Sequence, residues 1–130
     1  MSESKAVSDI NAPEALLQAY AGGQRAFSGL SLSQADLKGV DLKGADLSYA
    51  DLSDADLSQA NLRGADLSYA SLRGTNLSQA DLRGTMLIGT DLRQAQVAAT
   101  NFHDADYDPD ETHFPEGFDP IKAEMRRDRP

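Results

Sequence analysis

Two consecutive stretches decide the fold: residues 45–64 read ADLSYADLSDADLSQANLRG and residues 65–84 read ADLSYASLRGTNLSQADLRG. Fourteen of the twenty aligned positions are identical. A leucine recurs at every fifth residue, thirteen times without a gap, from Leu32 to Leu92. The register is continued on either side by aromatic or branched residues, at Phe27, Val97, Phe102 and Tyr107. A period of five fits neither a helix nor a flat strand, so it indicates a repeat architecture.

Twenty residues hold four five-residue segments, which predicts a coil with four short sides. We expect the leucines to point inward, and the Ala or Thr two positions before each leucine to leave room at the corners. Ser and Gly follow the leucines, as tight turns require. Coils of this all-β type stack about 4.8 Å apart. The repeat region, residues 25–107, therefore predicts about four coils.

The open ends of such a solenoid need covers. Residues 10–24 predict a helical cap, with Asn11 as N-cap, Glu14 completing a capping-box-like arrangement, and Gly22-Gly23 as the end. A mobile helix that binds a partner is the alternative interpretation. Residues 1–9 are expected to be a disordered tail.

Residues 108–130 are expected to form a C-terminal cap and tail. Phe114 and Phe118 supply aromatic rings where the repeat has stopped, and we expect them to fold over the last coil. A short helical piece is predicted from Ile121 to Arg127. The final residues, from about 127 to 130, are expected to be disordered.

The A(D/N)LxX pattern resembles the pentapeptide-repeat family, which implies a right-handed quadrilateral β-helix. The flanking arrangements LLxAYAxGxRxF and FPxGFDP are similar to those of cyanobacterial members, and the chain resembles a short, four-coil one. Members of the family do different things. The resemblance therefore implies a scaffold and does not imply an activity.

Composition restricts the function classes. The chain has 130 residues, a net charge of −9 and no cysteine, so it has no disulfide framework and no thiolate chemistry. Its well-mixed acidic surface argues against direct nucleic-acid binding, which needs clustered Lys and Arg. No signal peptide or membrane-length apolar run is evident. We expect a cytoplasmic monomer that binds an unknown protein partner.

The chain offers no motif for catalysis. His103 and His113 have no Ser or Cys partner at a recognisable spacing, and no phosphate-binding glycine motif is present. We therefore expect no enzyme, no cofactor and no metal site. One string superficially resembles the start of a calcium loop: Asp104, Asp106, Asp108 and Asp110. The sixth and twelfth positions of that loop hold proline instead of Gly and Glu, so we interpret the string as an acidic turn.

The twenty-residue period assigns outward residues to faces. One face gathers an apolar group with two acids, which we name the tyrosine face: Asp46, Tyr49, Asp66, Tyr69, Met86 and Ile88. Exposed aromatics and Met are enriched at interfaces, so this is the candidate interaction surface; ladder stacking that merely stiffens the rod is the alternative. A second column is basic and is either an anion-binding strip or simple charge balancing: Lys43, Arg63, Arg83 and His103.

These observations favour a non-enzymatic protein-interaction or scaffold module with a regulatory role in a process that the sequence does not name. The alternative is a DNA mimic that acts on DNA gyrase or another nucleic-acid-binding protein, as some members of the family do. A net charge of −9 fits mimicry, but the basic column interrupts the acidic surface. A small enzyme or metal protein is the third class, and no motif supports it.

Overall fold

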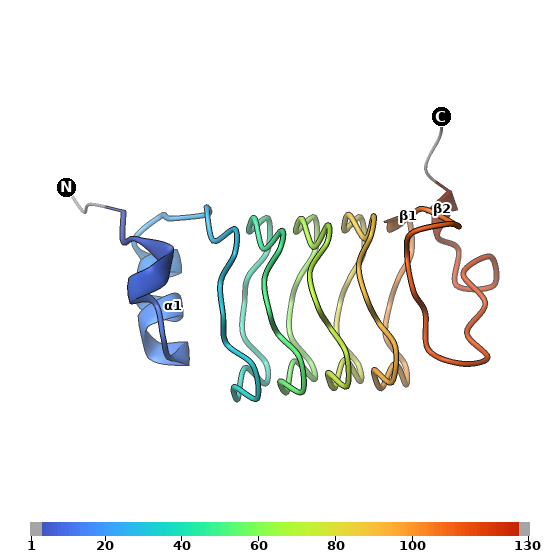
Figure 1. The fold of residues 1–130 in the computed structure, drawn as a ribbon, viewed down its shortest axis with the longest axis horizontal. Helices are drawn as coiled ribbons and strands as arrows, with labels where there is room; N and C mark the ends of the chain where they lie inside the picture. The colour runs from blue at the N-terminus through green and yellow to red at the C-terminus, as the bar shows by residue number, and fades with distance from the viewer. Residues whose placement is uncertain (1–3, 128–130) are drawn as a thin grey trace.

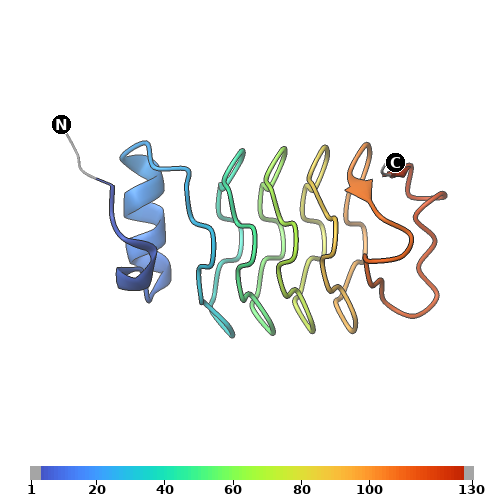
Figure 2. The ribbon, with the colours of Figure 1, turned by 45° about the horizontal axis from the view of Figure 1, so that its top comes forward.

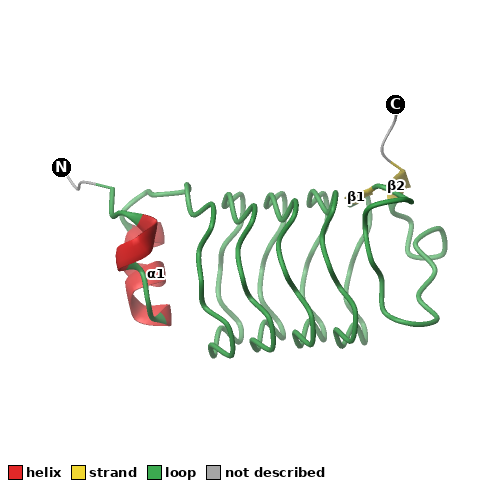
Figure 3. Ribbon diagram, viewed as in Figure 1, coloured by secondary structure: helices red, strands yellow, loops and turns green. Residues whose placement is uncertain are grey.

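A computed structural model describes residues 4–127. It shows a rod of stacked coils with a helix at one end and an irregular segment at the other (Figure 1). The assigned elements are few: the 3-10 helix η1 (Val7–Asp9), the helix α1 (Pro13–Ala21), and the two-residue strands β1 (Asp106–Tyr107) and β2 (Arg126–Arg127). Figure 3 accordingly draws the coils between α1 and β1 almost entirely as loop.

The coils are held in register by parallel bridges between residues twenty apart, such as Asp46↔Asp66 and Asp66↔Met86. Two backbone bonds accompany each bridge; the Leu47 N–H, for example, donates to the Asp66 carbonyl at 2.8 Å. The predicted solenoid of twenty-residue coils is confirmed. The expected all-β content is not reached, because a turn every five residues leaves each side too short for more than an isolated bridge.

The repeat leucines form one continuous core. From Leu37 to Leu92 none is more than 1% exposed, which confirms their inward orientation. The threonines of the small column do more than leave space. The Thr90 hydroxyl donates to the Leu67 carbonyl of the preceding coil at 2.7 Å, and Thr75 does the same to Leu52 at 2.8 Å. Thr75 and Thr90 therefore add buried hydrogen bonds between coils, a role that their size alone did not predict, whereas Thr85 donates to Leu82 in its own turn at 2.9 Å.

Every corner of the solenoid uses the same left-handed turn. The leucine carbonyl accepts the N–H three residues later, as from Ala45 to Leu42 at 3.1 Å. The residue two after each leucine has a positive φ at every corner from 29 to 104, in seven glycines and nine other residues. This is the geometry of a type II turn, which normally takes glycine at that position. The nine other residues store strain of about 1–2 kcal/mol each.

Most residues directly before the repeat leucines are Asp or Asn, and their side chains take part in the turn. In all eleven Asp and Asn residues at this position from Asp36 to Asn101, the side-chain oxygen accepts the N–H two residues later. Asp56 shows the effect clearly: it accepts both the Ser58 hydroxyl at 2.6 Å and the Ser58 N–H at 2.9 Å, and these bonds lower the pKa of the Asp56 carboxyl. Asp and Asn are interchangeable here because both supply the oxygen.

The helix α1 covers the first coil (Figure 1). Its Leu16 is fully buried, and the Tyr20 hydroxyl donates to the Lys43 carbonyl at 2.7 Å. The predicted N-cap at Asn11 is wrong. Ala12 is the N-cap, and its methyl side chain makes no hydrogen bond. The helix begins here because Pro13 favours the first helical position, where its lack of an N–H leaves no donor unpaired.

Residues 4–9 differ from the expected disordered tail, whereas residues 1–3 of that tail lie outside the described chain. Residues 4–9 include η1 and lead to Ile10, which is buried in the core. The side-chain amide of Gln24 holds Lys5 as a backbone partner would: its oxygen accepts the Lys5 N–H at 2.7 Å and its nitrogen donates to the Lys5 carbonyl at 2.9 Å. These bonds give the segment a defined path.

The C-terminal segment closes the other end (Figure 2). Phe118 packs against Phe102 and Phe114, with ring centroids 5.1 and 4.9 Å apart. The predicted helix from Ile121 to Arg127 is wrong. The backbone at Glu124 turns left-handed, with φ 61°, and β2 then pairs with β1 in the twenty-residue register of the solenoid. The exposed edge of the last coil takes these backbone bonds, which a helix could not supply.

Candidate interaction surface

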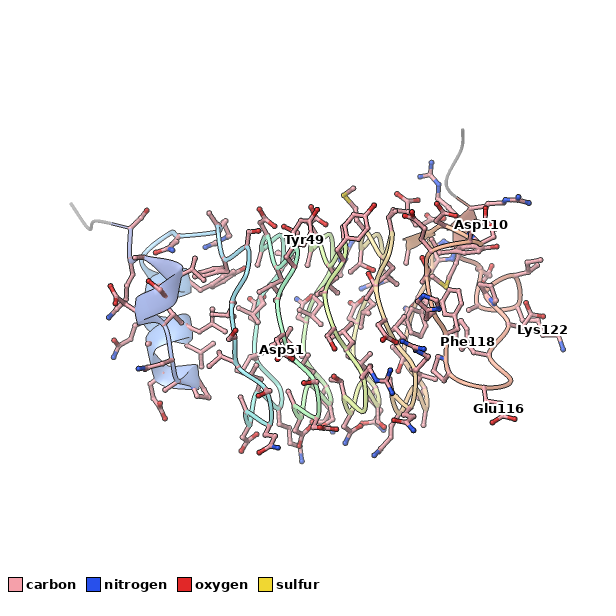
Figure 4. The ribbon with its side chains drawn as sticks, viewed as in Figure 1. Tyr49, Asp51, Asp110, Glu116, Phe118 and Lys122 are labelled. Atoms are coloured by element: carbon pink, nitrogen blue, oxygen red, sulfur yellow. The ribbon has the colours of Figure 1, made fainter. Side chains whose placement is uncertain are left out.

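The tyrosine face is built around two rings at one corner of the rod. Tyr49 and Tyr69 both occupy the left-handed turn position, each with φ 60°, on adjacent coils. Their rings stack with centroids 5.3 Å apart and an interplanar angle of 16°. The two side chains are nevertheless 65% and 47% exposed, and Figure 4 shows Tyr49 on the outer edge of the rod. A bulky residue with positive φ is uncommon, since glycine would fit the turn without strain.

The stack is anchored at its C-terminal end by two further contacts. The Tyr69 ring lies over Gly89, where a Cβ would collide with it. The Tyr69 hydroxyl donates to Oε2 of Glu111 at 3.2 Å, and this bond, followed by the negative charge of Glu111, raises the pKa of Tyr69. Glu111 reaches this position because its corner holds two extra residues: Asp91 pairs with His113, twenty-two residues on.

The other predicted residues of the tyrosine face lie beside this stack. Asp46, Asp66 and Met86 bridge to one another in the neighbouring column, and Met86 is 44% exposed. Ile88 is half-buried, and its carbonyl accepts the Tyr69 N–H at 2.9 Å. The structure thus brings all six residues to one side of three coils. The carboxylates of Asp46 and Asp66 each already accept one hydrogen bond, from the N–H of the serine two residues later.

The basic column lies at another corner, which we name the basic corner: Lys43, Arg63, Arg83 and His103. These residues line a shallow cavity of about 550 Å³ together with Gly64, Gly84 and Asp104. Arg83 makes a two-pronged pair with Asp81, at 2.9 and 2.7 Å, which lowers the pKa of the Asp81 carboxyl. His103 lies 3.4 Å from Asp104. No described carboxylate lies within ion-pair distance of Lys43 or Arg63.

The described residues form no cluster that could bind a metal ion. Within residues 4–127, no three His, Asp or Glu side chains gather closely enough to hold a metal ion. The acidic string from Asp104 to Asp110 instead follows the chain out of the last coil, where Asp108 accepts the Asp110 N–H at 2.9 Å. No helix in this part of the chain has the length and apolar character to cross a bilayer.

The repeat profile of the pentapeptide-repeat family matches residues 27–64 and 60–96, with eight copies of the repeat. The chain belongs to the pentapeptide-repeat family. Proteins of this family form right-handed β-helix solenoids, in agreement with the coils described above. No curated protein matches the sequence of this pentapeptide-repeat protein.

The chain is similar to solved structures of other proteins. A pentapeptide-repeat protein from Nostoc PCC 7120 is 47% identical, with a TM-score of 0.90 over 92% of this chain and 98% of that one. HetL, a pentapeptide-repeat protein involved in heterocyst differentiation regulation in the same organism, is 30% identical, with a TM-score of 0.53 over 75% of this chain and 53% of HetL. QnrB1, a fluoroquinolone resistance protein, is 21% identical, with a TM-score of 0.32 over 80% of this chain and 77% of QnrB1.

Proposed function

We propose that this protein is a non-enzymatic scaffold that binds another protein through its tyrosine face. The observation that carries the proposal is the stack of Tyr49 on Tyr69, which leaves two aromatic side chains exposed in a fixed arrangement. We further propose that it acts as a monomer in the cytoplasm. A regulatory role draws support from the likeness to HetL, of which the chain spans about half.

Rigidity favours this use of the rings. Ordering a flexible side chain at an interface costs about 0.5–1.5 kcal/mol, and a side chain that is already fixed avoids this cost. Tyr69 is held by Tyr49 on one side and by Gly89 and Glu111 on the other. Tyrosine also offers a large apolar area with few rotatable bonds. The face therefore presents a preorganised aromatic surface to a partner.

The competing interpretation is that the rings only stiffen the rod. The chain contains its own comparison for this idea: Gln59 and Gln79 occupy the same turn position on adjacent coils, at the opposite corner, and their amides are joined by a bond of 3.0 Å. That polar ladder joins two coils without any aromatic surface. A contact between adjacent coils at this turn position therefore does not require tyrosine. An apolar contact with a partner does require an apolar side chain, which glutamine does not supply.

The test uses the two ladders as a matched pair. The native chain, Tyr49→Ser plus Tyr69→Ser, and Gln59→Ser plus Gln79→Ser are each immobilised and exposed to an extract of the native organism. We expect circular dichroism to show an intact fold in all three. A partner identified by mass spectrometry should be captured by the native chain and the glutamine variant and lost from the tyrosine variant. Retention of that partner by the tyrosine variant would refute the proposal.

DNA mimicry remains the second candidate, because the net charge is −9 and the rod is acidic along several columns. Two features weigh against it. The carboxylates before the leucines accept backbone N–H groups, and the basic corner places Lys43, Arg63 and Arg83 on three successive coils. Gyrase supercoiling with and without a quinolone is the direct assay. Inhibition of gyrase, or its protection from the drug, would favour mimicry over the scaffold proposal.

A further inference from the structure

The basic corner carries a second inference, independent of the tyrosine face. We propose that it binds an acidic stripe on a helix of another protein, with Arg63 as the principal contact and with Lys43 and Arg83 on either side. Three features of the molecule support this: the pairing state of the arginines, the glycines beside them, and the spacing of the coils.

Arg63 is left available by a single substitution within the repeat. Arg83 and Arg93 each follow an aspartate by two residues. Each donates from Nε and Nη2 to the two carboxylate oxygens of that aspartate, at 2.7–2.9 Å. Arg63 follows Asn61 in the same way, and the Asn61 side chain accepts only the Arg63 N–H, at 3.1 Å. The turn is equally satisfied by Asn or Asp. Asparagine at this position therefore keeps the turn and leaves the Arg63 guanidinium without the acid that Arg83 and Arg93 have two residues before them. The charge of Asp81 on the next coil still acts on Arg63, but Asp81 bonds to Arg83 instead.

The surface next to the cations is open. Gly44, Gly64 and Gly84 occupy the left-handed turn position on the same three coils, and a Cβ at any of them would meet nothing within 4 Å. The corresponding positions at the tyrosine corner and at the corner of Gln59 and Gln79 carry long side chains on adjacent coils. A ligand can thus approach the backbone at this corner, in the cavity of about 550 Å³. Asp104 takes the place of glycine on the fourth coil and adds a negative charge there. The site therefore suits an anionic ligand that spans about three coils.

The coil spacing selects the shape of the ligand. Cations on successive coils recur about every 4.8 Å. Residues three and four apart on one face of a helix recur at rises of about 4.5 and 6.0 Å, so a stripe of glutamates keeps within about 1–2 Å of the cations over three coils. Same-face residues of an extended strand recur about every 6.6–6.8 Å and fall about 4 Å out of step over the same distance. An acidic helix therefore fits the corner better than an extended acidic segment.

The experiment measures binding of fluorescein-labelled synthetic peptides to the full chain by anisotropy, at low salt and at about 0.15 M salt. One peptide is an alanine-rich helix with its glutamates on one stripe. A second has the same composition with the glutamates spread around the helix, and a third is an extended peptide with glutamate at alternate positions. The protein variants are Asn61→Asp, which gives Arg63 an acid partner, and Asn76→Asp, which adds the same charge at the same turn position on another face.

We expect the striped helix to bind best, and more weakly at higher salt. Asn61→Asp should weaken binding about ten-fold, the equivalent of one charge-assisted hydrogen bond, whereas Asn76→Asp should change it by less than about two-fold. The double tyrosine variant should bind like the native chain. Absence of saturable binding at low salt, equal weakening by the two Asn→Asp variants, or tighter binding of the spread or extended peptide would each overturn the proposal.

Discussion

The left-handed corners make a prediction that can be worked out from one column of the rod. Gly39 and Ala99 occupy the same turn position at one corner, three coils apart, with φ 71° and 58°. A Cβ at Gly39 would touch nothing within 4 Å, so Gly39→Ala changes only the backbone energy. The left-handed conformation costs a non-glycine residue about 1–2 kcal/mol, and alanine recovers about 0.4–1 kcal/mol through the less disordered unfolded chain. Gly39→Ala should therefore destabilise by about 1 kcal/mol, and Ala99→Gly should stabilise by a similar amount.

Equilibrium urea unfolding followed by far-ultraviolet circular dichroism measures both changes as shifts of the midpoint at constant slope. Gly89→Ala is an informative third variant, because its Cβ would also collide with the Tyr69 ring. It should lose more stability than Gly39→Ala and should disturb the tyrosine stack. A neutral Gly39→Ala or a destabilising Ala99→Gly would contradict this prediction, since either result would mean that the folded state carries no strain at these corners.

Three other predictions concern the core and the titrating groups. Leu62→Ala should lower the free energy of unfolding by about 2–5 kcal/mol, because the side chain is fully buried; a loss well below that range in urea unfolding would contradict tight core packing. In an ultraviolet absorbance titration, one tyrosine should ionise above the ordinary range, and Glu111→Gln should reduce this rise in the pKa of Tyr69. Neutral Tyr69 supports the fold below the unfolded pKa of about 10, and that support is lost as the pH rises through the higher folded value. The pKa of Asp81 is lowered chiefly by its bond to Arg83. Ionised Asp81 therefore supports the fold above its unfolded pKa of about 4, and this support is lost as the pH falls through the lower folded value. Arg83→Met should consequently make the free energy of unfolding less dependent on pH on the acid side.

The coils could be predicted from the sequence because each coil repeats the previous one, shifted along the axis of the rod. When residues 45–64 and 65–84 share fourteen of twenty positions, equivalent side chains must occupy equivalent environments on adjacent coils. The burial of Leu62 and the stacking of Tyr49 on Tyr69 both follow from that single relation. The role of the acids was also within reach, because Asp and Asn alternate freely before the leucines, and they share an oxygen acceptor but no charge.

The ends could not be predicted in the same way, because nothing there repeats. Asn11 had the right chemistry for a cap, but Pro13 decided where the helix began. The segment from Ile121 to Arg127 had no partner visible in the sequence, and the edge of the last coil recruited it into β2. The contact between Tyr69 and Glu111 depends on two extra residues at one corner. The available signal was the interval from Thr90 to Thr112, which both donate to a leucine carbonyl of the preceding coil although they are twenty-two residues apart.

The twenty-residue register separates the length of this rod from the identity of its faces. Duplication of residues 45–64 would move the C-terminal cap outward by one coil, about 4.8 Å, and leave every column aligned. Insertion of a single five-residue segment would instead rotate everything that follows by one side, so a copy placed between Tyr69 and Glu111 would separate the hydroxyl from its carboxylate. Evolution or design can therefore adjust the reach of the scaffold in whole coils without altering its surfaces, while partial coils reassign the surfaces themselves.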